Sequence, residues 1–417
     1  MLESIVGASA GWMSGCRQPA RRPESPLLTM ICGEDYTRFT QRALDAHGSR
    51  VQTMPTLNSM TFQLSLYRDL FERRLPQPDI CQIDVIWPAM LADHLVDLAP
   101  YAGKDVQRFD PMLIENYTID GRLVALPLYS DSGLLYYRRD LLGKSGFGAP
   151  PETWVELEQM AKTIQAGERK KGKDNFWGYI WQGSRGECLT CNGLEWQASE
   201  GGGAILDGHR QVQVRNPRFQ YAIERAKGWV GTISPPAIVE YDEDDCLNLW
   251  LAGNAAFMRN WVYCYGLTRN GATPVREQFG VALMPAGSAG RARTLGGMAL
   301  AVSKYSRYRD QAAAVACYLT SEAVQRERAL VTGSVPTRPI LYRDPAALAQ
   351  TPFSGGLAGH ETEGLVARPS RVAGLNYDAV SRAYARWVHA ALTKECSVES
   401  ALAELERELF RVSADKA

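Results

Sequence analysis

Two acidic residues occupy positions where a folded chain has to give them a partner. Asp84 lies inside the otherwise apolar stretch 80–86, and a buried carboxylate is costly unless it meets a hydrogen-bond donor. A ligand hydroxyl is one such donor, and a backbone N–H is the alternative. Glu34 follows the apolar run 27–32 after Gly33. Its carboxylate is expected to stand at the edge of a crevice, or alternatively to complement a helix N-terminus.

An indole, a guanidinium and two glycines add the complementary chemistry. Trp261 ends an apolar run, and its ring either covers the C–H face of a ligand or packs in the core. Arg368 lies in a loop flanked by Gly and Pro, where its guanidinium either donates to a ligand hydroxyl or forms half of a surface ion pair. Gly296 and Gly297 leave their backbone N–H groups accessible to a hydroxyl. These groups suit non-covalent binding of a small hydroxylated molecule.

A third acidic group lies in the loop 240–245, which carries five carboxylates. Most of them are expected to form a solvated turn that caps the next helix. One of them, Glu240 or Asp242, is expected to reach the ligand.

Catalytic and metal motifs are weak in this sequence. Paired carboxylates and tryptophans also occur in glycoside hydrolases, which stay open as an alternative, but no carboxylate pair has an evident asymmetric environment. The Walker A loop and GxGxxG are absent from the sequence. Cys188 and Cys191 form a CxxC without a second pair at zinc-ligand spacing. They are interpreted as a structural pairing or as two packed thiols, and we expect no metal and no cofactor.

The elements that must position these residues alternate between strand and helix. Apolar runs predict strands at 27–32, 50–54 and 80–86, and helical spacing predicts helices at 36–47, 62–71 and 90–95. This order is typical of a doubly wound α/β domain with a mostly parallel sheet. After a strand that ends at Pro127 and a polar triplet, 129–131, a new strand is predicted at 134–137, which is the pattern of a crossing between two lobes.

The remainder of the chain repeats the alternation and ends in helices. Strands are predicted at 177–181, 255–260, 279–284 and 299–303, and helices at 153–166, 189–199, 217–228, 246–252, 308–319, 377–392 and 398–412. Thr153 with Glu156 has the spacing of a capping box. Two further crossings are expected, near Leu295 and near Val335.

The ordered set of segments 79–98, 120–138, 187–202, 257–261, 295–302 and 366–369 resembles the sugar-binding family of extracytoplasmic solute-binding proteins of bacterial ABC importers, above all its trehalose/maltose-binding subgroup. The resemblance implies a two-lobed periplasmic-binding-protein fold, α/β in class, with three crossing segments. It implies an N-lobe of 26–128 plus 295–335 and a C-lobe of 129–294 plus 336–417.

The same resemblance implies a function and a set of site residues. The function would be to bind a disaccharide or short oligosaccharide, to close around it and to deliver it to an ABC permease; a sugar-sensing receptor role is the other alternative. Tyr129 and Asp131 resemble the family's ring-plus-carboxylate pair, and Tyr377 follows the arginine loop. Met298 stands where some relatives carry an aromatic side chain.

The N-terminus and the overall charge bear on location. The small apolar segment 5–12 precedes Cys16, which resembles a lipidated cysteine, so 1–25 is interpreted as a signal or lipoprotein leader and tether; a start further upstream or a plain disordered leader are the alternatives. Formal net charge is zero, and we expect no nucleic-acid partner. We expect an exported monomer, periplasmic or anchored at the cell surface, with no membrane contact except through that lipid.

Overall fold

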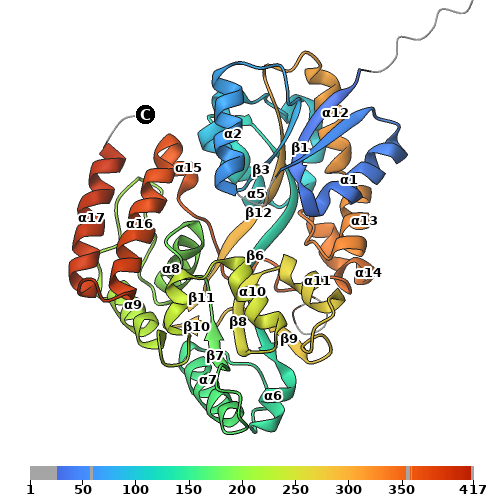
Figure 1. Cartoon of the computed structure of the whole chain (residues 1–417). Coiled ribbons are helices and arrows are strands. Elements are labelled where there is room, and N and C mark those ends of the chain that lie inside the picture. The colour runs from blue at the N-terminus through green and yellow to red at the C-terminus, as the bar shows by residue number, and fades with distance from the viewer. Residues whose placement is uncertain (1–25, 57–59, 354–356, 358, 415–417) are drawn as a thin grey trace, which may run out of the picture.

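A mixed sheet of nine strands runs through both lobes of the chain (Figure 1). The computed structural model describes residues 26–56, 60–353, 357 and 359–414, so Cys16 and the rest of 1–25 lie outside the described residues. In spatial order the main strands are β2 (Val51–Thr56), β1 (Leu28–Gly33), β3 (Ile80–Asp84), β12 (Arg293–Val302), β6 (Leu126–Arg138), β8 (Ala255–Trp261) and β7 (Trp177–Ile180). Two more join at the side, β9 (Phe279–Ala282) on β6 and β13 (Leu365–Val366) on β12.

The first lobe is built on parallel pairs. β1 pairs with β2 and with β3 in parallel, and the lobe also holds longer helices. They are α1 (Glu34–His47), α2 (Met60–Glu72), α12 (Arg309–Leu319) and α13 (Glu322–Thr332). This doubly wound order confirms the fold class expected from the alternation of apolar runs.

β6 and β12 are the strands that join the lobes. The break expected at 129–131 is wrong: β6 is one strand of 13 residues that includes the polar triplet. Its first half pairs antiparallel with β12, and its second half pairs with β8 and β9. β12 likewise begins at Arg293, six residues before the predicted start at Ala299. Both strands are longer because they belong to two cores in succession, and hydrophobic runs within one lobe do not reveal this.

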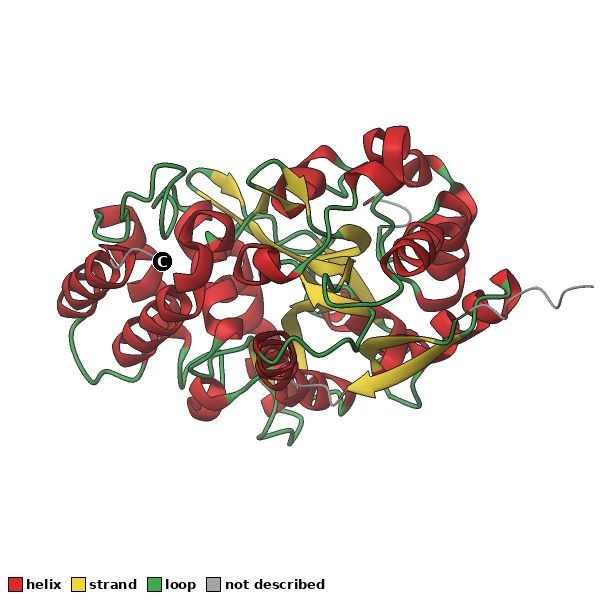
Figure 2. Cartoon of the chain, turned by 90° about the horizontal axis from the view of Figure 1, so that it is seen from above, coloured by secondary structure: helices red, strands yellow, loops and turns green. Residues whose placement is uncertain are grey.

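The second lobe packs helices around β6, β8 and β7. Figure 2 shows from above that helices lie on both sides of the strands of the chain. The long helices of the second lobe are α7 (Trp154–Arg169), α8 (Glu187–Ser199), α9 (Pro217–Trp229), α10 (Glu243–Leu251), α11 (Tyr263–Asn270), α16 (Tyr377–Leu392) and α17 (Val398–Ala414). The capping box predicted at Thr153 and Glu156 is present at the start of α7, and it fixes where that helix begins.

Short elements complete the chain. The helical ones are α3 (Pro88–Leu91), η1 (Ala92–His94), α4 (Ala99–Ala102), η2 (Gly103–Arg108), α5 (Pro111–Tyr117), α6 (Arg139–Lys144), η3 (Pro236–Glu240), η4 (Pro339–Arg343), α14 (Pro345–Leu348), α15 (Ser370–Ala373) and η6 (Gly374–Asn376). Two small hairpins pair β4 (Thr118–Ile119) with β5 (Arg122–Leu123), and β10 (Ala286–Gly287) with β11 (Gly290–Arg291). The helix predicted at 90–95 is divided between α3 and η1, and α13 was missed.

The segment near Val335 runs beside β6. The amide of Ser130 donates to the carbonyl of Val335 at 2.9 Å. Arg338 then forms an ion pair with Asp105 of the first lobe at 2.6 Å. This segment therefore lies against the first lobe as far as Arg338.

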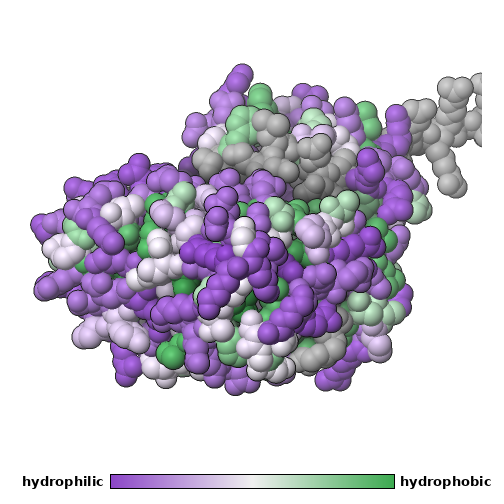
Figure 3. All heavy atoms as spheres, turned by 60° about the horizontal axis from the view of Figure 1, so that its bottom comes forward, coloured by the Kyte–Doolittle hydropathy of each residue, from purple (hydrophilic) through white to green (hydrophobic). Residues whose placement is uncertain are grey.

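The outer surface of the second lobe is mostly hydrophilic in the face that Figure 3 presents, with apolar side chains scattered over it. Among the described residues, no helix combines the length and the apolar character that crossing a membrane requires.

Candidate ligand-binding site

Arg368 joins three parts of the fold at one point. It is buried, and its Nη1 donates to Oε1 of Glu187 at 2.8 Å while its Nη2 donates to the carbonyl of Leu295 at 3.2 Å. The same Nη2 lies 3.7 Å from Oδ1 of Asp84. The loop arginine is thus no surface ion pair: it connects α8, the crossing strand β12 and the end of β3.

Glu187 is the acceptor on which this group converges. Its Oε1 also accepts from the hydroxyl of Tyr377 at 2.5 Å, and its Oε2 accepts from Oγ of Ser381 at 2.5 Å. Both donors come from the first two turns of α16. Sequence reasoning missed Glu187, since an acid at the first position of a helix is expected there for electrostatic reasons alone.

Asp84 ends β3 and has one oxygen committed. Its Oδ1 accepts from the amide of Ile86 at 3.0 Å, and among the described residues its Oδ2 has no hydrogen-bond partner. Burial raises the pKa of Asp84, and the guanidinium of Arg368 opposes that rise. Oδ1 of Asp84 therefore has the backbone N–H considered from the sequence, and Oδ2 is available to accept from a ligand hydroxyl.

Asp131 repeats this arrangement on β6. Its Oδ1 accepts from the amides of Ser132 and Val262, both at 2.7 Å. No hydrogen bond to its Oδ2 is present in the part of the chain that the structure describes. Burial raises the pKa of Asp131 to about 7, although these two amide donors lower it. Two half-buried carboxylates thus each keep one oxygen for a further donor.

Trp261 is held in place from two directions. Its Nε1 donates to Oε1 of Glu243 at 3.2 Å, and the guanidinium carbon of Arg259 lies 4.3 Å from its ring centroid. Arg259 is itself fixed by a fully buried bidentate pair with Glu195, at 2.6 and 3.0 Å. One face of the indole therefore has a cation–π partner, and the indole is only partly buried.

At both glycines of β12 a side chain would collide with a neighbour, and the neighbour differs between the two. A Cβ at Gly296 would lie 2.8 Å from Cζ3 of Trp261, so the absence of a side chain makes room for the indole. Gly297 has φ +121°, and a Cβ there would lie 2.4 Å from the carbonyl oxygen of Tyr129. Its carbonyl accepts from the amide of Val85 at 3.1 Å, so the strand contacts β3 there.

Two buried donors near Asp84 have no partner among the described residues. They are the hydroxyl of Tyr117, on α5, and Nε of Arg368. Burial raises the pKa of Tyr117, and the nearby charge of Asp84 raises it further. Buried donors are normally satisfied, so these two point to an acceptor that the protein itself does not supply. Tyr117 could not be found from the sequence, where it is one of several apolar-face residues of a short helix.

Six of the predicted site residues fall into two groups of neighbouring residues. Asp84, Arg368 and Tyr377 belong to one connected group, and Asp131, Trp261 and Gly296 to a second. The strand register joins the two groups, because Met298 pairs with both Asp84 and Tyr129, and Gly296 pairs with Asp131. The side chain of Glu34 lies outside what the structure describes; its backbone opens α1.

The two acids expected from the acidic loop have contacts of their own in the structure, and the ligand contact expected of one of them stays a prediction. The side chain of Glu240 is 74% exposed and lies 3.8 Å from Nε2 of His389. Asp242 caps α10 by accepting from the amides of Asp244 and Asp245. Glu243 is the acid of this loop that contacts Trp261, because the first turn of α10 faces the end of β8.

The two cysteines of the CxxC lie among the described residues. Cys188 and Cys191 are both buried free thiols, so the interpretation as packed thiols holds and the pairing does not. Burial raises the pKa of Cys188 to about 12. No group of three or more His, Cys, Asp or Glu side chains in the described ranges could hold a metal ion.

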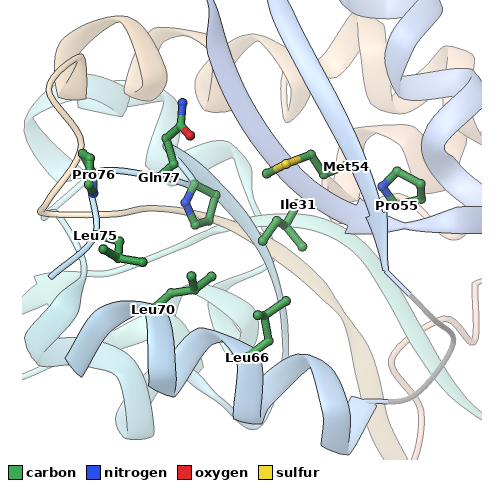
Figure 4. Close-up of a pocket in the computed structure, with 9 residues that line it drawn as sticks. Ile31, Met54, Pro55, Leu66, Leu70, Leu75, Pro76 and Gln77 are labelled. Atoms are coloured by element: carbon green, nitrogen blue, oxygen red, sulfur yellow. The ribbon is translucent and has the colours of Figure 1, made fainter. Parts of the chain in front are cut away.

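A cavity of about 490 Å³ lies elsewhere, in the first lobe between α2 and the β1–β2 pair. Figure 4 shows Leu66 and Leu70 facing it from the helix, and Ile31 and Met54 from the strands. Its lining is almost wholly apolar, so it offers few partners to a hydroxylated molecule. We therefore place the candidate site at the β6–β12 crossing.

Comparison with known proteins bears on the fold and the family of the chain. A model of the bacterial extracellular solute-binding protein family matches residues 71–326. A "Probable ABC transporter-binding protein" of Deinococcus radiodurans is 41% identical over 401 residues, which is 94% of this chain and 95% of that protein. Among solved structures, maltose-bound MalE3 of T. maritima superposes with a TM-score of 0.84 at 34% identity, covering 92% of this chain and 99% of that one. A solute-binding protein of Thermotoga lettingae with bound α-D-tagatose has a TM-score of 0.82 at 22% identity, covering 94% and 100%, and shows the fold.

Proposed function

This chain belongs to the bacterial extracellular solute-binding proteins, and from that premise we propose that it binds a maltose- or trehalose-like disaccharide, or a short oligosaccharide, for an ABC importer. The likeness to maltose-bound MalE3 supports a sugar of this size. More distant relatives include a "Mannitol-binding protein" of Pseudomonas aeruginosa, so a linear polyol is the alternative that the experiment below must separate.

The balance of charge in the candidate site carries the proposal. The two groups of the candidate site together hold four carboxylates, those of Asp84, Asp131, Glu187 and Glu243, and Asp84 and Glu187 are the two that lie beside the guanidinium of Arg368. The other arginine there, Arg259, is matched by Glu195. An anionic ligand such as a sugar phosphate or glutamate would meet an excess of negative charge. A neutral molecule with many hydroxyls would instead find free carboxylate oxygens and a partly exposed indole.

The two unpartnered donors support the same ligand class. The Tyr117 hydroxyl and Nε of Arg368 need an acceptor, and Oδ2 of Asp84 needs a donor. A sugar hydroxyl is both donor and acceptor, so one or two adjacent hydroxyls can satisfy all three groups. A carboxylate or phosphate can only accept at neutral pH, and it would leave Asp84 facing a like charge.

Thermal shift with a defined panel tests the proposal. Maltose, trehalose, mannitol, tagatose, glycerol 3-phosphate and glutamate would each be added at 1 mM, because a ligand that binds only the folded state raises the melting temperature by mass action. We expect a shift with maltose or trehalose and none with the two anions. Calorimetry on Asp84→Asn then locates the site, with Glu240→Gln as a matched control that removes an exposed acid. Binding of glutamate or glycerol 3-phosphate in preference to every neutral sugar would refute the proposal.

The family consists of transporter binding proteins, and hydrolysis is a separate outcome of the same experiment. Asp131, with its raised pKa, is the carboxyl group that a glycosidase would use as an acid. We expect maltose to be recovered intact after incubation with the protein. Release of glucose that is lost in Asp131→Asn would favour the hydrolase.

Location, partner and lobe movement belong to the same proposal. The ligand would bridge both lobes and favour the closed form, which would dock as a monomer on a permease. The expected lobes are 26–128 plus 295–335 and 129–294 plus 336–417; the ion pair of Arg338 with Asp105 favours a third crossing a few residues later. Export, with lipidation at Cys16, would hold the protein at the cell surface or in the periplasm.

A further inference from the structure

The segment 368–378 makes contacts with the first lobe that lie outside the ligand site. Its two ends, Arg368 and Tyr377, both bind Glu187 of the second lobe. Between them, α15 and η6 pack against α3 of the first lobe. The segment is therefore fixed to one lobe at its ends and touches the other with its middle.

Two ion pairs cross the boundary at this segment. Nη1 of Arg68, on α2, lies 2.6 Å from Oδ2 of Asp378, in the first turn of α16. Nη2 of the same arginine contacts the sulfur of Met90 at 3.3 Å, which holds the guanidinium over α3. Nη1 of Arg371 lies 2.5 Å from Oε1 of Glu115, on α5. Figure 1 shows α15 and α16 on the side of the second lobe that faces α2.

We propose that Arg68–Asp378 and Glu115–Arg371 form a clasp that stabilises the closed arrangement of the lobes, and so sets ligand affinity without touching the ligand. The clasp is made together with the contact of Arg368 to Asp84, which also joins the lobes. Separation of the lobes on this side would break all three ion pairs at once. A ligand that binds the closed form then gains affinity from the clasp, because each favourable lobe contact increases the closed fraction before binding.

The two ion pairs are expected to differ in how much they stabilise the closed arrangement. The side chains of Arg68 and Asp378 are 37% and 24% exposed, whereas those of Arg371 and Glu115 are 49% and 70% exposed. An exposed ion pair is screened and contributes little. The Arg68–Asp378 pair should therefore dominate, and Glu115–Arg371 should contribute less than a factor of two.

Small-angle scattering of the ligand-free full chain tests the clasp without any sugar. The variants are Asp378→Asn, Arg68→Gln and the two combined. Each is expected to increase the radius of gyration by the same amount, since removing either partner removes the same pair. Arg73→Gln is the matched control: it removes one charge directly after the same helix, but its partner is Asp69 of α2 itself, at 3.3 Å.

Calorimetry with maltose gives the second readout. Asp378→Asn should weaken maltose binding about threefold to fivefold, the combined variant by no more than that, and Arg73→Gln not at all. An equal effect of Arg73→Gln, additive effects of the two single variants, or tighter binding in Asp378→Asn would overturn the clasp. The clasp rests on the lobe closure of the proposed function, but the two can fail independently. If maltose does not bind the wild type, the scattering comparison still decides whether the ion pair holds the lobes together.

Discussion

A methyl group added at Gly296 should weaken sugar binding while leaving the fold intact. The new Cβ would lie 2.8 Å from Cζ3 and 3.3 Å from Cε3 of Trp261. Carbon atoms pack best at about 3.5–4.0 Å, so the indole has to move by roughly 1 Å. Overpacking of this size costs about 1–3 kcal/mol. The ring is only partly buried and can move outward, so the cost should appear in ligand affinity.

The expected loss is therefore about fivefold to a hundredfold in affinity, at 1.4 kcal/mol per factor of ten. Titration calorimetry measures it, with the sugar that gives the largest thermal shift. Gly297→Ala is the matched comparison one residue along the strand. There the φ of +121° and a backbone carbonyl at 2.4 Å from the new Cβ leave no flexible group to move, so stability should fall, with a melting temperature lower by roughly 5 °C or more.

The opposite pattern would refute this reasoning. If Gly296→Ala keeps full affinity, the indole of Trp261 does not contact the ligand. If both variants lose the same stability and the same affinity, the two glycines have one structural role, and the distinction drawn from their neighbours is wrong.

Four further substitutions separate binding from stability. Trp261→Ala should weaken sugar binding at least about tenfold. Trp154→Ala removes a fully buried indole that donates to Ser199 at 3.0 Å, and it should cost about 3–5 kcal/mol of unfolding free energy in denaturant titration. Reversed effects of the two variants would contradict the site. Glu195→Gln should cost about 3–5 kcal/mol by the same assay, because it leaves the guanidinium of Arg259 buried without its carboxylate, and a loss below 1 kcal/mol would count against this. Asp131 has a raised folded-state pKa of about 7, so the folded state holds a proton that the unfolded state releases between pH 4 and 7, and stability falls as pH rises through that window. Asp131→Asn keeps the amide acceptor and should flatten the pH dependence of the melting temperature there; an unchanged pH profile would show that Asp131 does not titrate in this range.

The sequence predicted the elements well where each is local. The helix 377–392 was predicted with the limits that the structure has, because Tyr377 and Leu392 bound a continuous apolar face. The start of α9 was equally clear, since Asn216 supplies a side-chain cap to the amide of Phe219. Such signals lie within a few residues of the feature that they define.

The site was predictable only in part, because it depends on pairing between distant strands. Asp84 stood out because a carboxylate in an apolar strand needs a reason. Glu187 and Glu243 did not, since each opens a helix and is explained there by the helix dipole. Only the positions of Arg368 and Trp261, fixed by the fold, show that these two acids also have a second partner.

The register of β12 is what assembles the site from these separate signals. Met298 pairs with Asp84 on one side and with Tyr129 on the other, and the register between β12 and β6 shifts just after it, so that Ala299 pairs with Pro127. An irregularity of this kind re-aims the side chains that follow it. On β6 it separates the part that packs in the first core, up to Leu128, from the part that carries Asp131, with Tyr129 buried between them. With a uniform register, the side chains of this strand could either pack in the core or face the site. The shift at Met298 allows one strand to do both.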